Sequence, residues 1–204
     1  MDLKRRNPAL RKAVVKLNDS FSGEGNAIFR YADGRADPVS VRAQLPRLEF
    51  SVAWETWDDF HERFRRMGGI AEEFVEGSFK TSPSVQLRTD PRGEVLPIST
   101  HDQVLGGPSG QVFLGCLFPA QDGYRRAITD EALKIGAVLG RRGVVSRFGV
   151  DFLAVREHPE DAWTLYALEI NLRMGGTTHP FLALQFLTGG RLDPETGLFL
   201  SPRG

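Results

Sequence analysis

The sequence predicts an α+β fold with antiparallel sheets, because short apolar strands pair through turn-rich connections and are separated by helices. Residues 13–18 and 27–31 are apolar and flank the loop DSFSGEG, a hairpin pattern with a glycine-bearing connection. Residues 147–155 and 164–172 form a second strand pair around the polar turn REHPEDA. These hairpins favour antiparallel over parallel pairing.

The helices follow from apolar residues at helical spacing. The first is expected over 55–67, before Gly68-Gly69, and its apolar stripe is predicted to face a core: Trp54, Trp57, Phe60, Phe64 and Met67. A second helix is expected over 124–139, with one apolar face made by Tyr124, Ile128, Ile135 and Leu139. A last helix begins near Thr178 and ends at Gly189-Gly190.

The remaining segments complete the β-structure. A strand is expected over 70–75, and residues 84–117 contain further strands around the turn Asp90-Pro91-Arg92-Gly93. Within that region the composition of DQVLGGPSG, residues 102–110, predicts a loop.

Composition excludes several classes of function. The 204 residues suit one large domain or two small lobes. Lys plus Arg (26) balance Asp plus Glu (26), so no basic field points to a nucleic-acid or membrane partner. The apolar runs are too short for a membrane span, and the N-terminus lacks the apolar region of a signal peptide. With a single cysteine, the pattern predicts a soluble cytoplasmic protein.

The strand pair carries a candidate metal site. If the hairpin centres near Glu160, Asp151 lies opposite Glu169, and Asn171 shares the face of Glu169 because side chains alternate along a strand. Two carboxylates that close repel unless a cation lies between them, and Mg²⁺ takes carboxylate and phosphate oxygens. A solvated charged face is the alternative. Arg173, a phosphate-binding guanidinium two residues on, favours the metal–nucleotide interpretation.

The first hairpin carries a candidate phosphate site. Lys16 stands in an apolar strand, where an ammonium group is costly unless it finds an anion. The small residues of the following loop, 20–26, let backbone N–H groups approach phosphate oxygens. The loop is neither a Walker A motif nor a dinucleotide fingerprint, and a plain hairpin turn remains the alternative.

In this order, the pieces resemble the ATP-grasp superfamily of carboxylate–amine ligases. VVKLNDSFSGEGNAIFRY resembles the lysine strand and phosphate-covering loop, AEEFVEG the adenine-binding hinge, and GVDFLAV with YALEINLRMGG the metal-binding strands. The last of these, with its E-x-N-x-R run, is the most specific. KLNDSFSGEGNAIFRY and EINLRMGGTTHP are most similar to the pheganomycin-type peptide ligases. The resemblance covers about residues 11–190.

The resemblance implies two α+β lobes with antiparallel sheets that sandwich ATP, residues 1–75 as the nucleotide-binding lobe and 76–204 as the C-terminal lobe. Lys16 would contact the phosphates and act with Arg173 in catalysis. The implied nucleotide-binding residues also include Ser22, Gly23, Gly25, Glu72, Glu73, Phe74, Val75 and Glu76. Glu76 is the candidate for the ribose, although the family carries that glutamate a few residues later. Asp151, Glu169 and Asn171 match the ligands of Mg²⁺, with Mn²⁺ as an alternative.

The implied activity is amide formation from a carboxylate and an amine, such as amino acids or peptides, through an acyl phosphate. Only MDLKRRNPALRK precedes the lysine strand, which leaves no room for the family's upstream domain and second lysine. We therefore expect an incomplete or truncated ligase, with a missing domain or a second copy as its partner. The alternatives are a non-catalytic ATP-binding subunit and a small-molecule kinase.

The sequence alone does not decide the roles of three further residues. His101, before the glycine-rich segment, is interpreted as a surface-loop histidine, with substrate contact as the alternative. His179 either reaches phosphate or helps to start the last helix, and Arg147 either holds a carboxylate or is an exposed strand-end arginine.

Overall fold

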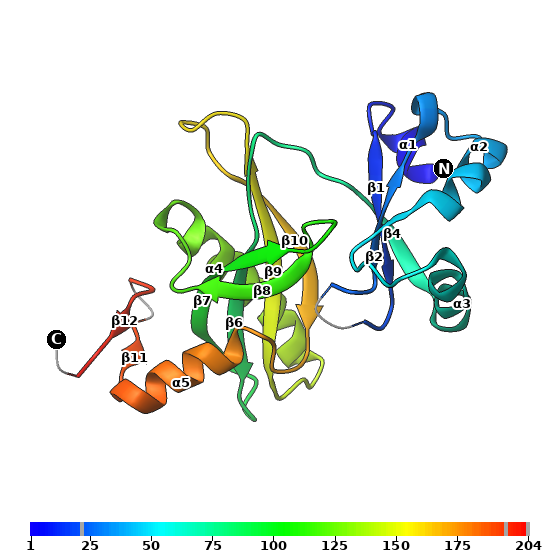
Figure 1. Ribbon diagram of the computed structural model, residues 1–204. Coiled ribbons are helices and arrows are strands. Elements are labelled where there is room, and N and C mark those ends of the chain that lie inside the picture. Colours follow the sequence, from blue (N-terminus) through cyan, green and yellow to red (C-terminus); the bar gives the residue numbers. More distant parts are fainter. Residues whose placement is uncertain (21–22, 194–195, 203–204) are drawn as a thin grey trace. The chain divides into compact units, whose positions relative to one another are not determined.

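The computed structural model describes residues 1–20, 23–193 and 196–202. The chain divides into two compact units that are discontinuous in sequence (Figure 1). Unit 1 consists of Met1–Glu76 and Leu105–Phe113, and unit 2 of Gly77–Val104 and Leu114–Gly204. Both units combine helices with antiparallel sheet, so the predicted α+β class is confirmed.

Unit 1 contains a four-stranded antiparallel sheet of order β3-β2-β1-β4. The strands are β1 (Lys12–Leu17), β2 (Asn26–Arg30), β3 (Glu49–Phe50) and β4 (Gly69–Glu73). Its α-helices are α1 (Asp2–Arg6), α2 (Pro38–Gln44) and α3 (Trp57–Met67), and its short 3₁₀ helices are η1 (Ala32–Gly34) and η2 (Leu45–Arg47). The predicted hairpin of β1 and β2 is confirmed, with Lys16 opposite Asn26.

The core of unit 1 follows from alternation along its strands. Every second residue of β1 and β2 faces the helices, and the buried cluster comprises Ala13, Leu17, Ala27, Phe29, Leu48 and Phe60. Helix α3 begins after Thr56, whose Oγ1 accepts a hydrogen bond from the backbone N–H of Asp59. Trp54 therefore precedes the helix and is 70% exposed, and Met67 is exposed as well, so the predicted core stripe is wrong at both ends.

Unit 2 is built on a six-stranded sheet of order β10-β9-β6-β7-β8, with β5 paired to β9. Its strands are β5 (Phe79–Thr81), β6 (Pro83–Thr89), β7 (Val95–Gly106), β8 (Val112–Leu117), β9 (Arg147–Arg156) and β10 (Thr164–Asn171). The helices are α4 (Asp122–Arg141) and α5 (Thr178–Thr188), and a small sheet joins β11 (Arg191–Leu192) to β12 (Phe199–Leu200).

Helix α4 covers one face of this sheet. Tyr124 and Ile128 are fully buried, and Ile135 and Leu139 pack against the same cluster, as the helical spacing predicts. The strands contribute buried residues from alternate positions: Val85, Leu87, Phe148, Val150, Phe152 and Ala154. Within the described ranges, no helix has the length and apolar character that crossing a membrane requires.

Strand β10 departs from the simple alternation that its sequence predicts. A bulge between Ala167 and Glu169 changes the register, so Tyr166 lies opposite Leu153 whereas Ile170 lies opposite Val150. Because Leu153 and Val150 face opposite sides of the sheet, Tyr166 and Ile170 cannot share one face. As an edge strand, β10 also leaves Ile170 46% exposed.

Candidate functional site

The two carboxylates of the candidate metal site lie directly opposite each other. Asp151 of β9 pairs with Glu169 of β10, as the hairpin symmetry about Glu160 predicts. Asn171 follows on the same face of β10, and its Nδ2 donates a hydrogen bond to Asp151 Oδ2 at 3.0 Å. Opposed residues of a sheet have Cβ atoms about 4.5–5.5 Å apart, which is within reach of one shared cation.

Electrostatics at this pair favour a cation. The pKa of Asp151 is raised to about 6, mainly by burial and also by the nearby Glu169 carboxylate, while hydrogen bonds with Ser84 and Asn171 and the charge of Arg173 lower it. A divalent ion beside Asp151 and Glu169 would attract both carboxylates and so offset the repulsion between them. The donors are carboxylate and amide oxygens, the hard ligands that Mg²⁺ and Mn²⁺ take.

The protein itself supplies few ligands here. Over the ranges that the structure describes, no group of three or more His, Cys, Asp or Glu side chains is placed to hold a metal. Two carboxylates and one amide oxygen fit a cation that completes its shell with other oxygens, which is how Mg²⁺ binds together with phosphates. Asp151, Glu169 and Asn171 therefore suit a metal–nucleotide complex better than a structural metal site.

A buried polar network that the sequence does not reveal lies behind Asp151. Thr178 Oγ1 donates to Gln86 Oε1 at 3.2 Å, and Gln86 Nε2 donates to Ser84 Oγ at 3.4 Å. Ser84 lies opposite Asp151 in the sheet and hydrogen-bonds to its carboxyl group. All three side chains belong to buried residues, which are at most 7% exposed. The network thus connects the N-terminus of α5 with the candidate metal ligand.

Gly149 makes room for this network. It lies opposite Gln86 in the sheet, and a Cβ on it would come 2.6 Å from Gln86 Nε2, closer than van der Waals contact allows. The only obvious signal in the sequence was the small residue two positions before Asp151. Periodicity could not identify Gln86, because a polar residue in a strand is ordinarily expected on a solvated face.

The segment between β10 and α5 carries Arg173. Its side chain is exposed and donates to the carbonyl of Met174 at 3.3 Å. The end of the segment is fixed, because the backbone N–H of Gly175 donates to Thr178 Oγ1 at 3.0 Å. His179 is the second residue of α5 and is exposed. Arg147 is partly buried as the first residue of β9 and lies opposite Arg88.

The expectation of a surface-loop histidine at position 101 is wrong. His101 is 0% exposed in β7, a strand that extends through Gly106 and so includes half of the predicted loop. Its ring packs against Phe118 and Phe181, and neither ring nitrogen has a hydrogen-bond partner within the described structure. Burial lowers the pKa of His101 to about 4, so the ring is neutral at pH 7.

Lys16 forms an ion pair with an acidic residue of unit 1. Its Nζ lies 2.5 Å from Glu72 Oε2, and the two side chains are only 20% and 30% exposed. Lys16 faces away from the core cluster because it alternates with Leu17, so its ammonium lies on the opposite face of the sheet. A nucleotide phosphate there would compete with Glu72 for the ammonium.

The packing of the candidate phosphate loop itself requires glycine at two positions. Gly23 has φ +82°, and a Cβ on it would lie 2.4 Å from the carbonyl oxygen of Gln111. A Cβ on Gly25 would lie 2.3 Å from Ser20 Cβ. Ser22, the third predicted residue of this loop, lies outside the described residues.

A second glycine-rich segment, residues 105–111, packs against this loop within unit 1. Ser109 Oγ donates to Ser51 Oγ at 2.9 Å, and Ser51 Oγ donates to the carbonyl of Asn26 at 2.9 Å. A Cβ on Gly107 would lie 3.2 Å from the carbonyl oxygen of Ser51. This contact could not be predicted from the sequence, because the two segments are far apart in the chain.

The predicted hinge residues comprise the last two residues of β4 and the three that follow it. Glu73 accepts a hydrogen bond from Asn7 Nδ2 at 3.0 Å, and Glu76 forms an ion pair with Lys12 at 3.1 Å. The Lys12 ammonium also lies 4.8 Å from the centre of the Phe74 ring. Glu72, Glu73, Phe74, Val75 and Glu76 are thus consecutive residues of unit 1, and their role with a nucleotide stays a prediction.

Known proteins resemble this chain in both sequence and fold. The family described as "IQCH-like, ATP-grasp" matches residues 38–195. L-propargylglycine--L-glutamate ligase from Streptantibioticus cattleyicolor is 38% identical over 138 residues, which are 68% of this chain and 27% of that protein. IQ motif-containing protein H from Danio rerio is 26% identical over 154 residues, which are 76% of this chain and 14% of that protein. The chain spans less than a third of either relative's length.

The fold agrees with these matches. The crystal structure of N5-carboxyaminoimidazole synthetase from Staphylococcus aureus complexed with ADP superposes with a TM-score of 0.56. The match covers 92% of this chain and 40% of that one at 12% identity, so it establishes shared fold. The ATP-grasp fold expected from the motifs is confirmed, and because the family match covers most of the sequence, the chain belongs to the IQCH-like ATP-grasp family.

Proposed function

We propose that this chain is the Mg²⁺·ATP-binding part of an ATP-dependent carboxylate–amine ligase that joins amino acids or peptides. The observation that carries the proposal is the direct pairing of Asp151 with Glu169, with Asn171 hydrogen-bonded to the same carboxylate. Support for the substrate class comes from the 38% identical relative, whose name describes the joining of two amino acids.

In this proposal residues 1–75 and 76–204 form the two nucleotide-binding lobes. Lys16 exchanges Glu72 for the α- and β-phosphates, and Gly23, Gly25 and the neighbouring Ser22 cover the phosphate chain. The hinge residues bind the base and the ribose through Glu72, Glu73, Phe74, Val75 and Glu76. These groups of unit 1 bind the nucleotide part of ATP, and Asp151, Glu169 and Asn171 of unit 2 bind its Mg²⁺ or Mn²⁺.

The reaction divides into two steps. The substrate carboxylate attacks the γ-phosphoryl group and releases ADP, and the amine then attacks the acyl phosphate to release phosphate and leave an amide. Bound metal would supply charge neutralisation for the transferred phosphoryl group. The protein's part is positioning and charge stabilisation: Lys16 holds the phosphates, and Arg173 stabilises the charge on the transferred group.

Metal-binding measurements test whether the paired Asp151 and Glu169 hold a cation. We expect Mn²⁺ titrations followed by electron paramagnetic resonance, with ADP present, to show one site that Glu169→Gln weakens by at least about tenfold, since a charged oxygen ligand is lost. Glu160→Gln, in the exposed turn of the same hairpin, is the matched control and should leave the affinity unchanged. Equal affinity in the wild type and Glu169→Gln would contradict the assignment.

Chemical trapping tests the reaction class. Hydroxylamine converts an acyl phosphate into a hydroxamate, so a ligase should yield hydroxamate from a panel of amino acids, ATP and Mg²⁺. A kinase would instead transfer phosphate to a hydroxyl group without forming hydroxamate. Phosphorylated product without hydroxamate would replace the ligase proposal with the kinase.

A further inference from the structure

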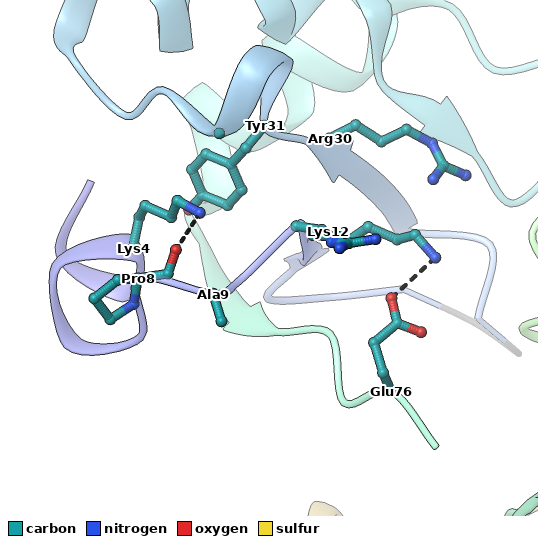
Figure 2. Close-up of a pocket in the computed structure, with 9 residues that line it drawn as sticks. Lys4, Pro8, Ala9, Lys12, Arg30, Tyr31 and Glu76 are labelled. Carbon is teal, nitrogen blue, oxygen red and sulfur yellow. Dashed lines mark hydrogen bonds and ion pairs between the residues drawn. The ribbon is translucent and has the colours of Figure 1, made fainter. Parts of the chain in front are cut away.

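Unit 1 contains a cavity of about 600 Å³, and Glu76 is the one residue of its described lining that the function proposed above also uses. It lies where β1 begins and β2 ends, next to α1 and η1 (Figure 2). All of its lining residues belong to unit 1. The volume falls in the range of about 300–1,000 Å³ that is usual for small-molecule sites.

The lining is strongly cationic. Lys4, Arg11, Lys12 and Arg30 line the cavity, and among the lining side chains that the structure describes only Glu76 carries a carboxylate. Lys12 and Arg30 lie directly opposite each other on β1 and β2, an arrangement of like charges that is unfavourable by itself. Each is balanced by one acid: Lys12 pairs with Glu76 at 3.1 Å, and Arg30 pairs with Glu49 at 2.6 Å.

The two remaining cations, Lys4 and Arg11, have no acidic partner among the side chains that the structure describes. The Lys4 ammonium donates to the carbonyl oxygens of Pro8 and Leu10, at 2.6 and 2.7 Å, and these neutral acceptors leave its charge uncompensated. The side chain of Arg11 makes no hydrogen bond or ion pair within the part of the chain that the structure describes. The cavity thus holds an excess of two positive charges after its ion pairs are counted.

One of these cations is held in place rather than free to move. The two carbonyl bonds fix the Lys4 ammonium, which also lies 5.7 Å from the centre of the Tyr31 ring (Figure 2). An ammonium that is already immobilised loses little entropy when it binds an anion. Arg11 adds a planar group with several N–H donors, which suits the paired oxygens of a carboxylate or a phosphate.

We propose that this cavity is a binding site for a small organic anion, which Lys4 and Arg11 recognise through a carboxylate or phosphate group. The Tyr31 ring and the apolar atoms of Pro8 and Ala9 would contact the body of the ligand. The site is separate from the proposed phosphate contact of Lys16. Lys12 and Lys16 are four residues apart on one strand, which places their Cα atoms about 13 Å apart.

Nuclear magnetic resonance titrations of the isotope-labelled chain test the proposal. Inorganic phosphate and glutarate are the two probes, and the tighter one identifies the anion class. We expect saturable shifts of backbone amides in residues 9–12 and 30–34 at millimolar probe concentrations. Arg11→Gln should lower the affinity by about tenfold or more, the scale of one lost charge-assisted hydrogen bond. Because Arg11 is exposed and unpaired within the described residues, this variant should fold normally.

Two variants complete the design. Arg66→Gln removes the same charge from an exposed position of α3 outside the cavity, and it should bind the probes like the wild type. An equal loss in Arg66→Gln and Arg11→Gln would reduce the effect to general electrostatics and overturn the proposal. Lys16→Gln should leave probe binding intact. If it abolished binding, the anion site would be the phosphate site of the nucleotide, and the proposal would also be wrong. Because each outcome is read from probe binding without nucleotide, it does not depend on the ligase proposal.

Discussion

The buried amide of Gln86 offers a quantitative test of how the fold supports the candidate metal site. In Gln86→Leu, the Thr178 hydroxyl loses its acceptor and Ser84 loses one donor, both in buried surroundings. One unsatisfied buried group costs about 1–3 kcal/mol, so we expect unfolding in urea to show a loss of this size. Leucine is close to glutamine in volume, which keeps the packing contribution small.

The same substitution should weaken metal binding. Ser84 positions Asp151, and groups that orient a metal ligand typically contribute about 10- to 100-fold in affinity. Mn²⁺ affinity in the presence of ADP, measured by electron paramagnetic resonance, should therefore fall by at least about tenfold. Gln121→Leu, at an exposed position before α4, is the control and should change neither quantity. A loss of stability with unchanged Mn²⁺ affinity would show that the network is purely structural and refute the reasoning.

Three further predictions address other parts of the chain. Because the folded-state pKa of His101, about 4, lies below its ordinary value of about 6.5, the unfolded chain binds the proton first, and stability present above pH 6.5 is lost as the pH falls towards 4. His101→Leu removes this dependence. The difference in unfolding free energy between His101→Leu and the wild type should therefore change by about 2 kcal/mol in favour of the variant as the pH falls from 7.5 to 5. A difference that stays the same at all pH values would contradict the assignment. Gly23→Ala should destabilise unit 1 more than Gly93→Ala destabilises unit 2, since both have a positive φ but only Gly23 faces a carbonyl at 2.4 Å; equal losses in urea unfolding would remove the steric argument. Lys16→Gln should weaken ADP binding by about tenfold or more in calorimetry, while Lys134→Gln, on exposed α4 surface, should not; equal affinities would exclude Lys16 as a phosphate contact.

The hairpins and their register could be predicted because local patterns determine them. Alternation and a polar turn were enough to place Asp151 opposite Glu169. Alternation did not predict the register between that pair and the turn, where a bulge lies at Ala167/Glu169. The bulge depends on how β10 fits against β9, and the residue types in β10 do not indicate it. Element boundaries shifted for a similar reason, because β7 pairs with both β6 and β8 and continues through Gly106 into the predicted loop.

Residues whose role depends on distant neighbours could not be predicted. His101 resembles a loop residue by its sequence context, yet Phe118 and Phe181 bury it from elsewhere in the chain. Gln86 gains its contacts from α5, 92 positions later. The cavity at Lys4 and Arg11 likewise forms only when α1 packs next to the ends of β1 and β2, so the basic N-terminus carried no functional signal in the sequence.

Calorimetric titration of the chain with ADP, with and without Mg²⁺, tests the central claim most directly. We expect saturable binding at or below millimolar nucleotide when Mg²⁺ is present, and markedly weaker binding when Mg²⁺ is removed by a chelator, because Asp151 and Glu169 then repel the phosphates. Folded protein that binds no nucleotide at millimolar concentration, or that binds it equally well without a divalent cation, would contradict the account.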